Sequence, residues 1–230
     1  VRELPAGTNT GVFHDMLPGM EPDHRIQLVL ALADRRDPDI HDTAVNMLAE
    51  ENEAFQLAGL RALHAVGKAG DVPLLAAYAA GHRGDLREEA RGVLYSLKGE
   101  AVDNKLVASL SSSPPDVQEE LIRAIGRRNM RQEVERVMEM VGSEDRNVRV
   151  EALRVLGEIG SPDDLPELIA LSTGLSSRRE REEAERMLTR IAEDVPEAEG
   201  RSALFLQMLK PLEDTDTKVL FIHVLGNLGD

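Results

Sequence analysis

One apolar position recurs along the whole chain and constrains the fold more than any other feature. Steps of 31 residues back from Leu156 each reach another aliphatic residue, and steps of 32 and then 37 residues do so going forward. The members of this apolar column are Leu32, Leu63, Leu94, Ile125, Leu156, Leu188 and Leu225. A self-similar period in the thirties is typical of a repeat protein, in which each unit packs against its neighbours.

Each repeat is predicted to hold two helices. Residues 148–171, VRVEALRVLGEIGSPDDLPELIAL, begin with an amphipathic stretch that stops at Gly160. A second apolar stretch follows, with Ser161 placed as an N-cap and Pro162 in the first turn. One helix cannot bury its own apolar stripe, so the chain must turn back and stack a partner helix on it.

Two polar columns mark where the predicted helices begin and end. Acidic or amide residues suited to an N-cap recur at Asp23, Asp85, Asp116, Asn147 and Asp216. A helix-stop column recurs at Gly67, Lys98, Asn129, Gly160, Ala192 and Gly229. Four of its six members tolerate the left-handed backbone that often ends a helix.

Strand signals are missing from the sequence. There is no run of alternating β-branched residues and no Asn-Gly hairpin. Aromatic residues make up only 3% of the chain and Trp is absent, so the core must be built from aliphatic side chains. These features predict an all-α fold.

Three segments resemble the HEAT repeat, specifically the short bacterial kind found in phycobilisome-lyase-like proteins. They are FQLAGLRALHAVGKAGDVPLL, DVQEELIRAIGRRN and NVRVEALRVLGEIGSPDDLPELI, and the resemblance spans residues 20–229. It implies a right-handed α-α superhelix, a HEAT/armadillo-type solenoid of about six to seven helix pairs. We expect residues 1–22 to form an N-terminal arm and a short capping helix. We expect residues 23–230 to form a single solenoid domain, part of a longer chain.

A column of cations provides the candidate binding site. Its members are Arg61, Arg123, Arg154, Arg186 and His223, with Gly92 as a gap. In HEAT-like solenoids the second helix of each pair lines the concave face, so the resemblance implies that these cations form a stripe along a groove. On a chain of net charge −15, a basic stripe suits an acidic peptide or a carboxylate-bearing partner.

A charge-balanced helix face is the competing interpretation of the same column. The i,i+3 pairs Glu120–Arg123, Glu151–Arg154 and Glu183–Arg186 can each stabilise a helix by about 0.2–0.5 kcal/mol without any ligand. Arg61 is the exception, because Leu57 and Ala58 precede it and no local carboxylate neutralises it.

A further column contains only long hydrogen-bond donors: Arg25, Gln56, Arg87, Gln118, Arg149, Arg181 and Lys218. HEAT consensus sequences carry Arg at this place, where it bonds to neighbouring repeats. We therefore predict a structural role for the donor column and no part in catalysis.

The sequence predicts no catalytic residue, no cofactor and no metal site. Cysteine is absent, and the six histidines form neither an HExxH nor an HxxxH pair. The chain also lacks the repeated His-Glu dipeptides by which HEAT-like hydroxylases hold iron, and it has no phosphate loop, GxSxG motif or kinase signature. No apolar stretch reaches the 18 residues that a membrane span needs, so no membrane partner is expected.

These observations favour a non-catalytic scaffold that uses the concave groove to bind a protein or peptide, with an acidic partner favoured, or another domain of the same longer chain. The alternative that the resemblance implies is a lyase-like enzyme, or a subunit of one, acting on a partner protein that carries a linear tetrapyrrole. Nucleic-acid binding ranks last, because a net charge of −15 repels phosphates.

We expect a soluble protein of the cytoplasm or periplasm. The longer interval at residues 192–202 is expected to be a surface loop, with a partner-contacting loop as its sharper interpretation.

Overall fold

The computed structural model describes Val1 and residues 10–195, 198–209 and 214–228. Over these residues all regular secondary structure is α-helix or 3-10 helix, which confirms the all-α prediction. The chain divides into two compact units, Val1–Ser109 and Leu110–Asp230. The separation of residues 1–22 from a domain at 23–230 stays a prediction. No described helix has the length and hydropathy needed to cross a membrane.

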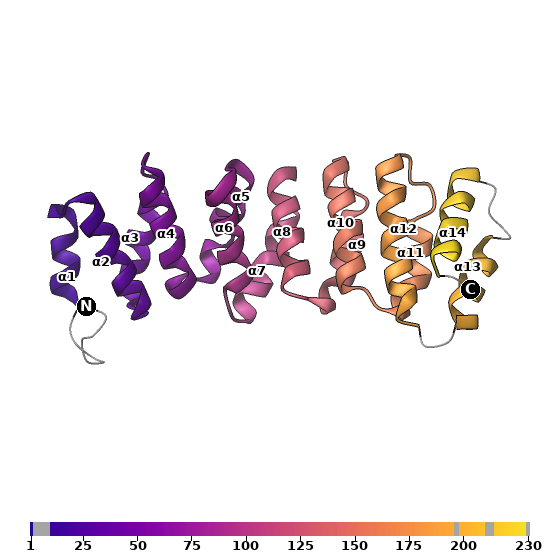
Figure 1. The fold of residues 1–230 in the computed structure, drawn as a ribbon, viewed down its shortest axis with the longest axis horizontal. Helices are drawn as coiled ribbons and strands as arrows, with labels where there is room; N and C mark the ends of the chain where they lie inside the picture. The colour runs from indigo at the N-terminus through magenta and orange to yellow at the C-terminus, as the bar shows by residue number, and fades with distance from the viewer. Residues whose placement is uncertain (2–9, 196–197, 210–213, 229–230) are drawn as a thin grey trace. The chain divides into compact units, whose positions relative to one another are not determined.

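In the first unit one row of helices, α2, α4 and α6, packs side by side, and α3 and α5 pair with α4 and α6 (Figure 1). Short 3-10 turns, such as Ala69–Asp71 before α5, connect several of them. The helices are α1 (Gly11–Met16), α2 (Pro22–Asp34), α3 (His41–Met47), α4 (Glu53–Val66), α5 (Val72–Gly81), α6 (Gly84–Ser96) and α7 (Glu100–Leu110), whose last residue begins the second unit.

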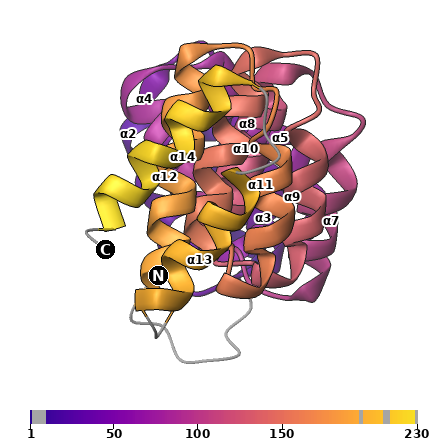
Figure 2. The same cartoon turned by 90° about the vertical axis from the view of Figure 1, so that its right-hand side faces the viewer.

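The second unit repeats this arrangement. Helices α8, α10, α12 and α14 form the row, while α9, α11 and α13 pack on α10, α12 and α14 (Figure 1 and Figure 2). The helices are α8 (Pro115–Arg127), α9 (Val134–Met140), α10 (Arg146–Ile159), α11 (Leu165–Leu171), α12 (Arg178–Glu193), α13 (Ala198–Leu209) and α14 (Thr215–Leu228).

The apolar column forms the core of both rows. Every member from Leu32 to Leu188 is fully buried. Burial of an aliphatic side chain of this size contributes about 1.5–3 kcal/mol to folding. Leu225, in the last helix of the row, is only half-buried. The 31-residue period therefore gives each repeat one apolar anchor, and six of the seven anchors are fully buried.

The predicted N-caps are wrong by two residues. Asp23, Asp85 and Asp116 lie inside the first turn, where a carboxylate interacts favourably with the helix dipole. The side chains that do cap the helices lie two residues before the predicted positions in the repeat. Asn52 accepts a hydrogen bond from the Ala54 N–H at 2.9 Å, and Asp145 accepts one from the Asn147 N–H at 2.8 Å. Ser161 is confirmed as a cap, because it forms a capping box with Asp164 at the start of a 3-10 turn, Pro162–Asp164, that leads into α11.

The left-handed backbone predicted for the helix-stop column is found at Asn129 but not at Gly67 or Gly160. Asn129 is left-handed, with φ of 53°, but Gly67 and Gly160 have extended backbones with φ of −62° and −66°. A Cβ added to Gly160 would lie 2.8 Å from Ile191 Cδ1 of the next repeat, and Gly67 is crowded in the same way. These two glycines allow close packing between repeats. Gly229 lies outside the described residues.

The predicted loop at residues 192–202 is wrong at both ends. Helix α12 continues to Glu193, and α13 already begins at Ala198. Residues 196–197 lie outside the described residues. Residues 192–202 therefore include the end of α12 and the first turn of α13, as well as the connection between them.

Candidate functional site

Five members of the donor column tie their helix to the end of the preceding helix or to the connection that follows it. Its side chains donate to carbonyl groups that helix ends leave without partners. These bonds run from Gln56 to Glu50 (2.7 Å), Arg87 to Ala79 (3.0 Å), Gln118 to Leu110 (2.9 Å), Arg149 to Ser143 (2.8 Å) and Arg181 to Leu175 (3.0 Å). Arg149 also pairs with Glu180 of the next repeat at 2.6 Å. The structural role predicted for this column is confirmed at these positions.

Arg123 and Arg154, in the middle of the cation column, belong to an ion-pair network. Arg123 Nη1 lies 2.8 Å from Glu120 Oε1, and its Nε lies 3.2 Å from Glu151 Oε1 on the next helix. Arg154 pairs with the same Glu151 and, at 2.6 Å, with Glu158. The hydrogen bonds that Arg154 donates to the Glu151 carboxylate raise the pKa of Arg154 above its ordinary value. Because Glu120 and Glu151 are buried, this network belongs to the packing of α8 against α10.

The last two members of the column are exposed. Arg186 is 70% exposed and pairs with Glu183 at 2.7 Å within its own helix, α12. His223 on α14 is 59% exposed and lies 3.2 Å from Glu185 of α12. Together with the network on α8 and α10, Arg186 completes the three i,i+3 pairs that the charge-balanced interpretation predicted.

Arg61, in the first unit, has a different environment. Its side chain is 56% exposed, and its Nε lies 3.8 Å from Glu89 Oε2 on α6. Glu89 is shared with His64, whose Nε2 lies 3.1 Å from Oε1. The other ring nitrogen of His64 contacts Ser96 Oγ at 2.8 Å. The carboxylate that is missing three or four positions before Arg61 is thus supplied by Glu89 of the next repeat, but at the outer limit of an ion pair.

Arg61 lines a polar cleft of 540 Å³ in the first unit, together with Arg36 and Lys98. Both of these cations are exposed, and neither forms an ion pair within the described part of the chain. The other lining residues are Asp34, His64, Ala65, Gly67, Ser96 and Leu97. Three exposed cations around one cleft can bind a carboxylate or another anion, and Arg can do so with two parallel hydrogen bonds.

Sequence reasoning missed Arg36 and Lys98 as site residues, although the signal was present. Lys98 is a member of the helix-stop column, and one step of 31 residues back from Gly67 reaches Arg36. The three turns that end α2, α4 and α6 therefore meet at the cleft. Gly67, the middle member, packs against the next repeat, because a Cβ added to it would lie 2.8 Å from Leu97 Cδ2.

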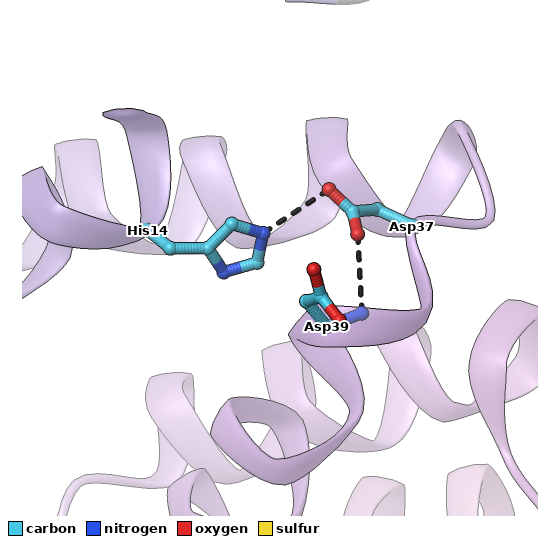
Figure 3. Close-up of side chains that lie close together, drawn as sticks. All are labelled: His14, Asp37 and Asp39. Atoms are coloured by element: carbon cyan, nitrogen blue, oxygen red, sulfur yellow. Dashed lines mark hydrogen bonds and ion pairs between the residues drawn. The ribbon is translucent and has the colours of Figure 1, made fainter. Parts of the chain in front are cut away.

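A second cluster of titratable groups lies at the start of the first unit (Figure 3). His14 Nε2 is 3.1 Å from Asp37 Oδ2, and Asp37 Oδ1 accepts a hydrogen bond from the Asp39 N–H at 3.1 Å. Burial alone would raise the pKa of Asp37, but hydrogen bonds from Thr10, His14 and Asp39 bring it below its ordinary value.

The ligand atoms of His14, Asp37 and Asp39 lie within 4.8 Å of one another, close enough to meet at one metal ion. Sequence reasoning missed this cluster because 23 residues separate His14 from Asp37. Both oxygens of Asp37 already accept hydrogen bonds, and Asp37 caps the 3-10 turn Pro38–Ile40. We therefore assign the cluster a structural role in fastening α1 to the turn before α3.

The sequence matches a known protein family. The family model for HEAT repeats matches residues 12–94 and 104–189, which is more than half of the chain. The chain belongs to the HEAT-repeat family. This confirms the resemblance on which the predicted fold depended.

Two solved structures are similar to this HEAT-repeat chain. One is the complex of CpcE and CpcF of phycocyanin lyase from Nostoc sp. PCC7120, with 17% identity over 99% of each chain and a TM-score of 0.41. The other is an engineered protein, with 18% identity over 94% of each chain and a TM-score of 0.37. No curated protein sequence matches the chain. HEAT repeats serve many functions, so the function must be argued from the site.

Proposed function

We propose that this HEAT-repeat chain is a non-catalytic scaffold that binds a protein or peptide through carboxylate groups of the partner. The binding site is the basic cleft, defined by Arg36, Arg61 and Lys98. The observation that supports this proposal is the concentration of three exposed cations around one 540 Å³ cleft, in a chain whose net charge is −15.

The ion pairs around the cleft are weak enough for a partner to replace. Arg61 is more than half exposed and lies 3.8 Å from its only described carboxylate partner, Glu89. An exposed pair of this kind contributes about 0–1 kcal/mol, so a carboxylate of the partner can compete for Arg61 at little cost. By contrast, a ligand would have to break buried pairs to reach Arg123 or Arg154.

The exposed end of the cation column extends this proposal to the second unit. Arg186 and His223 are each held by a single described carboxylate and keep more than half of their side chains in solvent. They are available for a partner contact of their own. Arg123 and Arg154, which the sequence also placed in the binding column, would contribute mainly by holding α8 and α10 in place.

The test uses a fluorescent peptide in which Glu alternates with Gly, and the same peptide with Gln in place of Glu. Fluorescence anisotropy should show tighter binding of the Glu peptide by the wild type, and the preference should weaken as salt is added. The variant Arg36→Glu, Arg61→Glu, Lys98→Glu should lose at least about tenfold in affinity, equivalent to 1.4 kcal/mol.

A charge-matched control separates the cleft from the overall charge. Arg131, Arg136 and Arg179 are exposed residues of the second unit, and changing all three to Glu alters the net charge by the same amount. This control should keep the preference of the wild type for the Glu peptide. Equal binding of the Glu and Gln peptides by the wild type, or equal losses in both variants, would refute the proposal.

A further inference from the structure

An open groove lies between α9 and α11 of the second unit. It has a volume of 550 Å³ and is lined by Glu135, Met138, Glu139, Glu167, Ala170 and Leu171. The two helices belong to the layer that packs on α10 and α12, and Figure 2 shows them side by side. Helix α8 precedes them and α12, α13 and α14 follow them in the same unit, so the groove is a lateral face of the stack and not one of its ends.

Apolar side chains form the floor of the groove. Met138 is buried and Leu171 is half-buried. Ala170 is exposed, and the position one repeat earlier holds Glu139. The short side chain of Ala170 leaves the α11 side of the groove open, so a larger apolar side chain of a partner can enter there.

Carboxylates lie on both sides of this floor. Glu135 and Glu139 are four residues apart and share one face of α9, while Glu167 shares a face of α11 with Ala170. All three glutamates are exposed. Glu139 lies 3.0 Å from Arg136 in an exposed pair, and no ion pair joins Glu135 or Glu167 to another residue of the described ranges.

The neighbouring sequence provides almost no positive charge to balance these carboxylates. Residues 157–177, which contain α11 and both of its connections, have no Lys or Arg, and Arg136 is the one cation of α9. An exposed pair such as Arg136–Glu139 can be replaced at little cost. The groove therefore combines an apolar floor with uncompensated negative charge, and the net charge of −15 attracts cationic partners from a distance.

We propose that this acidic groove, defined by its six lining residues, binds an amphipathic helix whose apolar stripe is flanked by Lys or Arg. A large apolar side chain of the partner packs on Met138, Ala170 and Leu171, and the cations pair with the glutamates on either side. A helix can carry cations on both flanks of one apolar stripe, whereas an extended segment places alternate side chains on opposite faces. This partner is opposite in charge to the one proposed for the basic cleft, so the chain brings together two different partners.

Fluorescence anisotropy with a labelled peptide of Leu and Lys tests this proposal. The amphipathic peptide has Leu at the i, i+3, i+4 and i+7 spacing, and a scrambled peptide of the same composition has no apolar face. The wild type should bind the amphipathic peptide at least about tenfold more tightly than the scrambled one, and added salt should weaken the binding. The variant Glu135→Gln, Glu139→Gln, Glu167→Gln should lose at least about tenfold in affinity for the amphipathic peptide.

A charge-matched control separates the groove from the overall charge of the chain. Glu144, Glu193 and Asp194 are exposed residues of the same unit outside the groove. Changing them to Gln, Gln and Asn alters the net charge by the same amount, and this control should bind the amphipathic peptide like the wild type.

A further variant tests the apolar floor without a change of charge. Ala170→Gln lies at an exposed helical position, so the chain should keep its helicity by circular dichroism. The longer side chain should fill the groove and weaken binding of the amphipathic peptide, while binding of the scrambled peptide should not change.

Three results would each overturn the proposal. They are equal affinities of the wild type for the two peptides, equal losses in the two triple variants, and an unchanged affinity in Ala170→Gln. A wild type that binds neither peptide also overturns it, and self-association in sedimentation velocity would then assign the groove to a second copy. The acidic groove belongs to the second unit and the basic cleft to the first, so the two proposals succeed or fail separately.

Discussion

Arg61 and Arg154 occupy the same column of the repeat but have opposite environments. Arg154 is 30% exposed and pairs with Glu151 and Glu158, whereas Arg61 is 56% exposed and lies 3.8 Å from Glu89. The residue three positions earlier accounts for much of the difference. It is the buried carboxylate Glu151 before Arg154, and it is Ala58 before Arg61.

The comparison teaches that a column in a repeat protein fixes where a side chain lies but not whether it is available. In the second unit Arg123 and Arg154 stabilise the contact between α8 and α10. In the first unit the absence of a carboxylate three positions earlier leaves Arg61 available, and the turns contribute Arg36 and Lys98 beside it. The same repeat geometry thus yields a structural network in one place and a candidate binding site in another.

The largest expected effect comes from breaking the two ion-pair systems in parallel. Glu151→Ala removes the carboxylate shared by Arg123 and Arg154, and should lower the free energy of unfolding by about 3 kcal/mol. Glu89→Ala should lower it by less than about 1 kcal/mol, because the pair with Arg61 is exposed and long. Urea denaturation of both variants measures the difference. Equal losses would show that the two environments are not distinct.

A smaller effect is expected when Arg61 is given a carboxylate of its own. Leu57 is half-buried, and the same position holds a glutamate in three other repeats, at Glu88, Glu119 and Glu182. Leu57→Glu should place an i,i+4 carboxylate near Arg61 and weaken binding of the Glu peptide by about threefold to tenfold. Leu57→Gln is the matched control and should bind the peptide like the wild type. If Leu57→Glu and Leu57→Gln bound the Glu peptide with similar affinities, a role for Arg61 in peptide binding would be contradicted.

The smallest expected effect concerns the pH dependence of the Asp37 cluster. The pKa of Asp37 is below its ordinary value of 3.8, so its carboxylate stabilises the folded state above that pH. The contribution is lost as the pH falls through the lowered pKa. Asp37→Asn should therefore cost about 1 kcal/mol at neutral pH, and the difference from the wild type should disappear in strong acid. Thermal unfolding across this pH range measures it, and a constant difference would show that the charge is not involved.

Much of the fold could be predicted because repetition multiplies weak signals. The apolar column predicted buried anchors, and those from Leu32 to Leu188 are fully buried. The donor column was correctly assigned, because a long donor just inside each helix can reach the carbonyl groups of the preceding turn. Cap positions were misplaced by two residues, since an acidic side chain is equally suited to the cap and to the first turn.

The candidate site could be predicted only in part. Arg61 was singled out because Leu57 and Ala58, and no carboxylate, lie four and three positions before it. Arg36 and Lys98 were not, because they lie in turns and only the packing of three repeats brings those turns together.

The central claim is that acidic ligands bind at the cleft formed by the first three turns of the row. The most direct test is an NMR titration of the isotope-labelled chain with the Glu peptide. The account predicts that amide shifts change at Arg36, Gly67 and Lys98, and that Gly160, the counterpart of Gly67 in the second unit, does not move. Changes that follow Arg123 and Arg154 on α8 and α10, with none at the three turns, would contradict it.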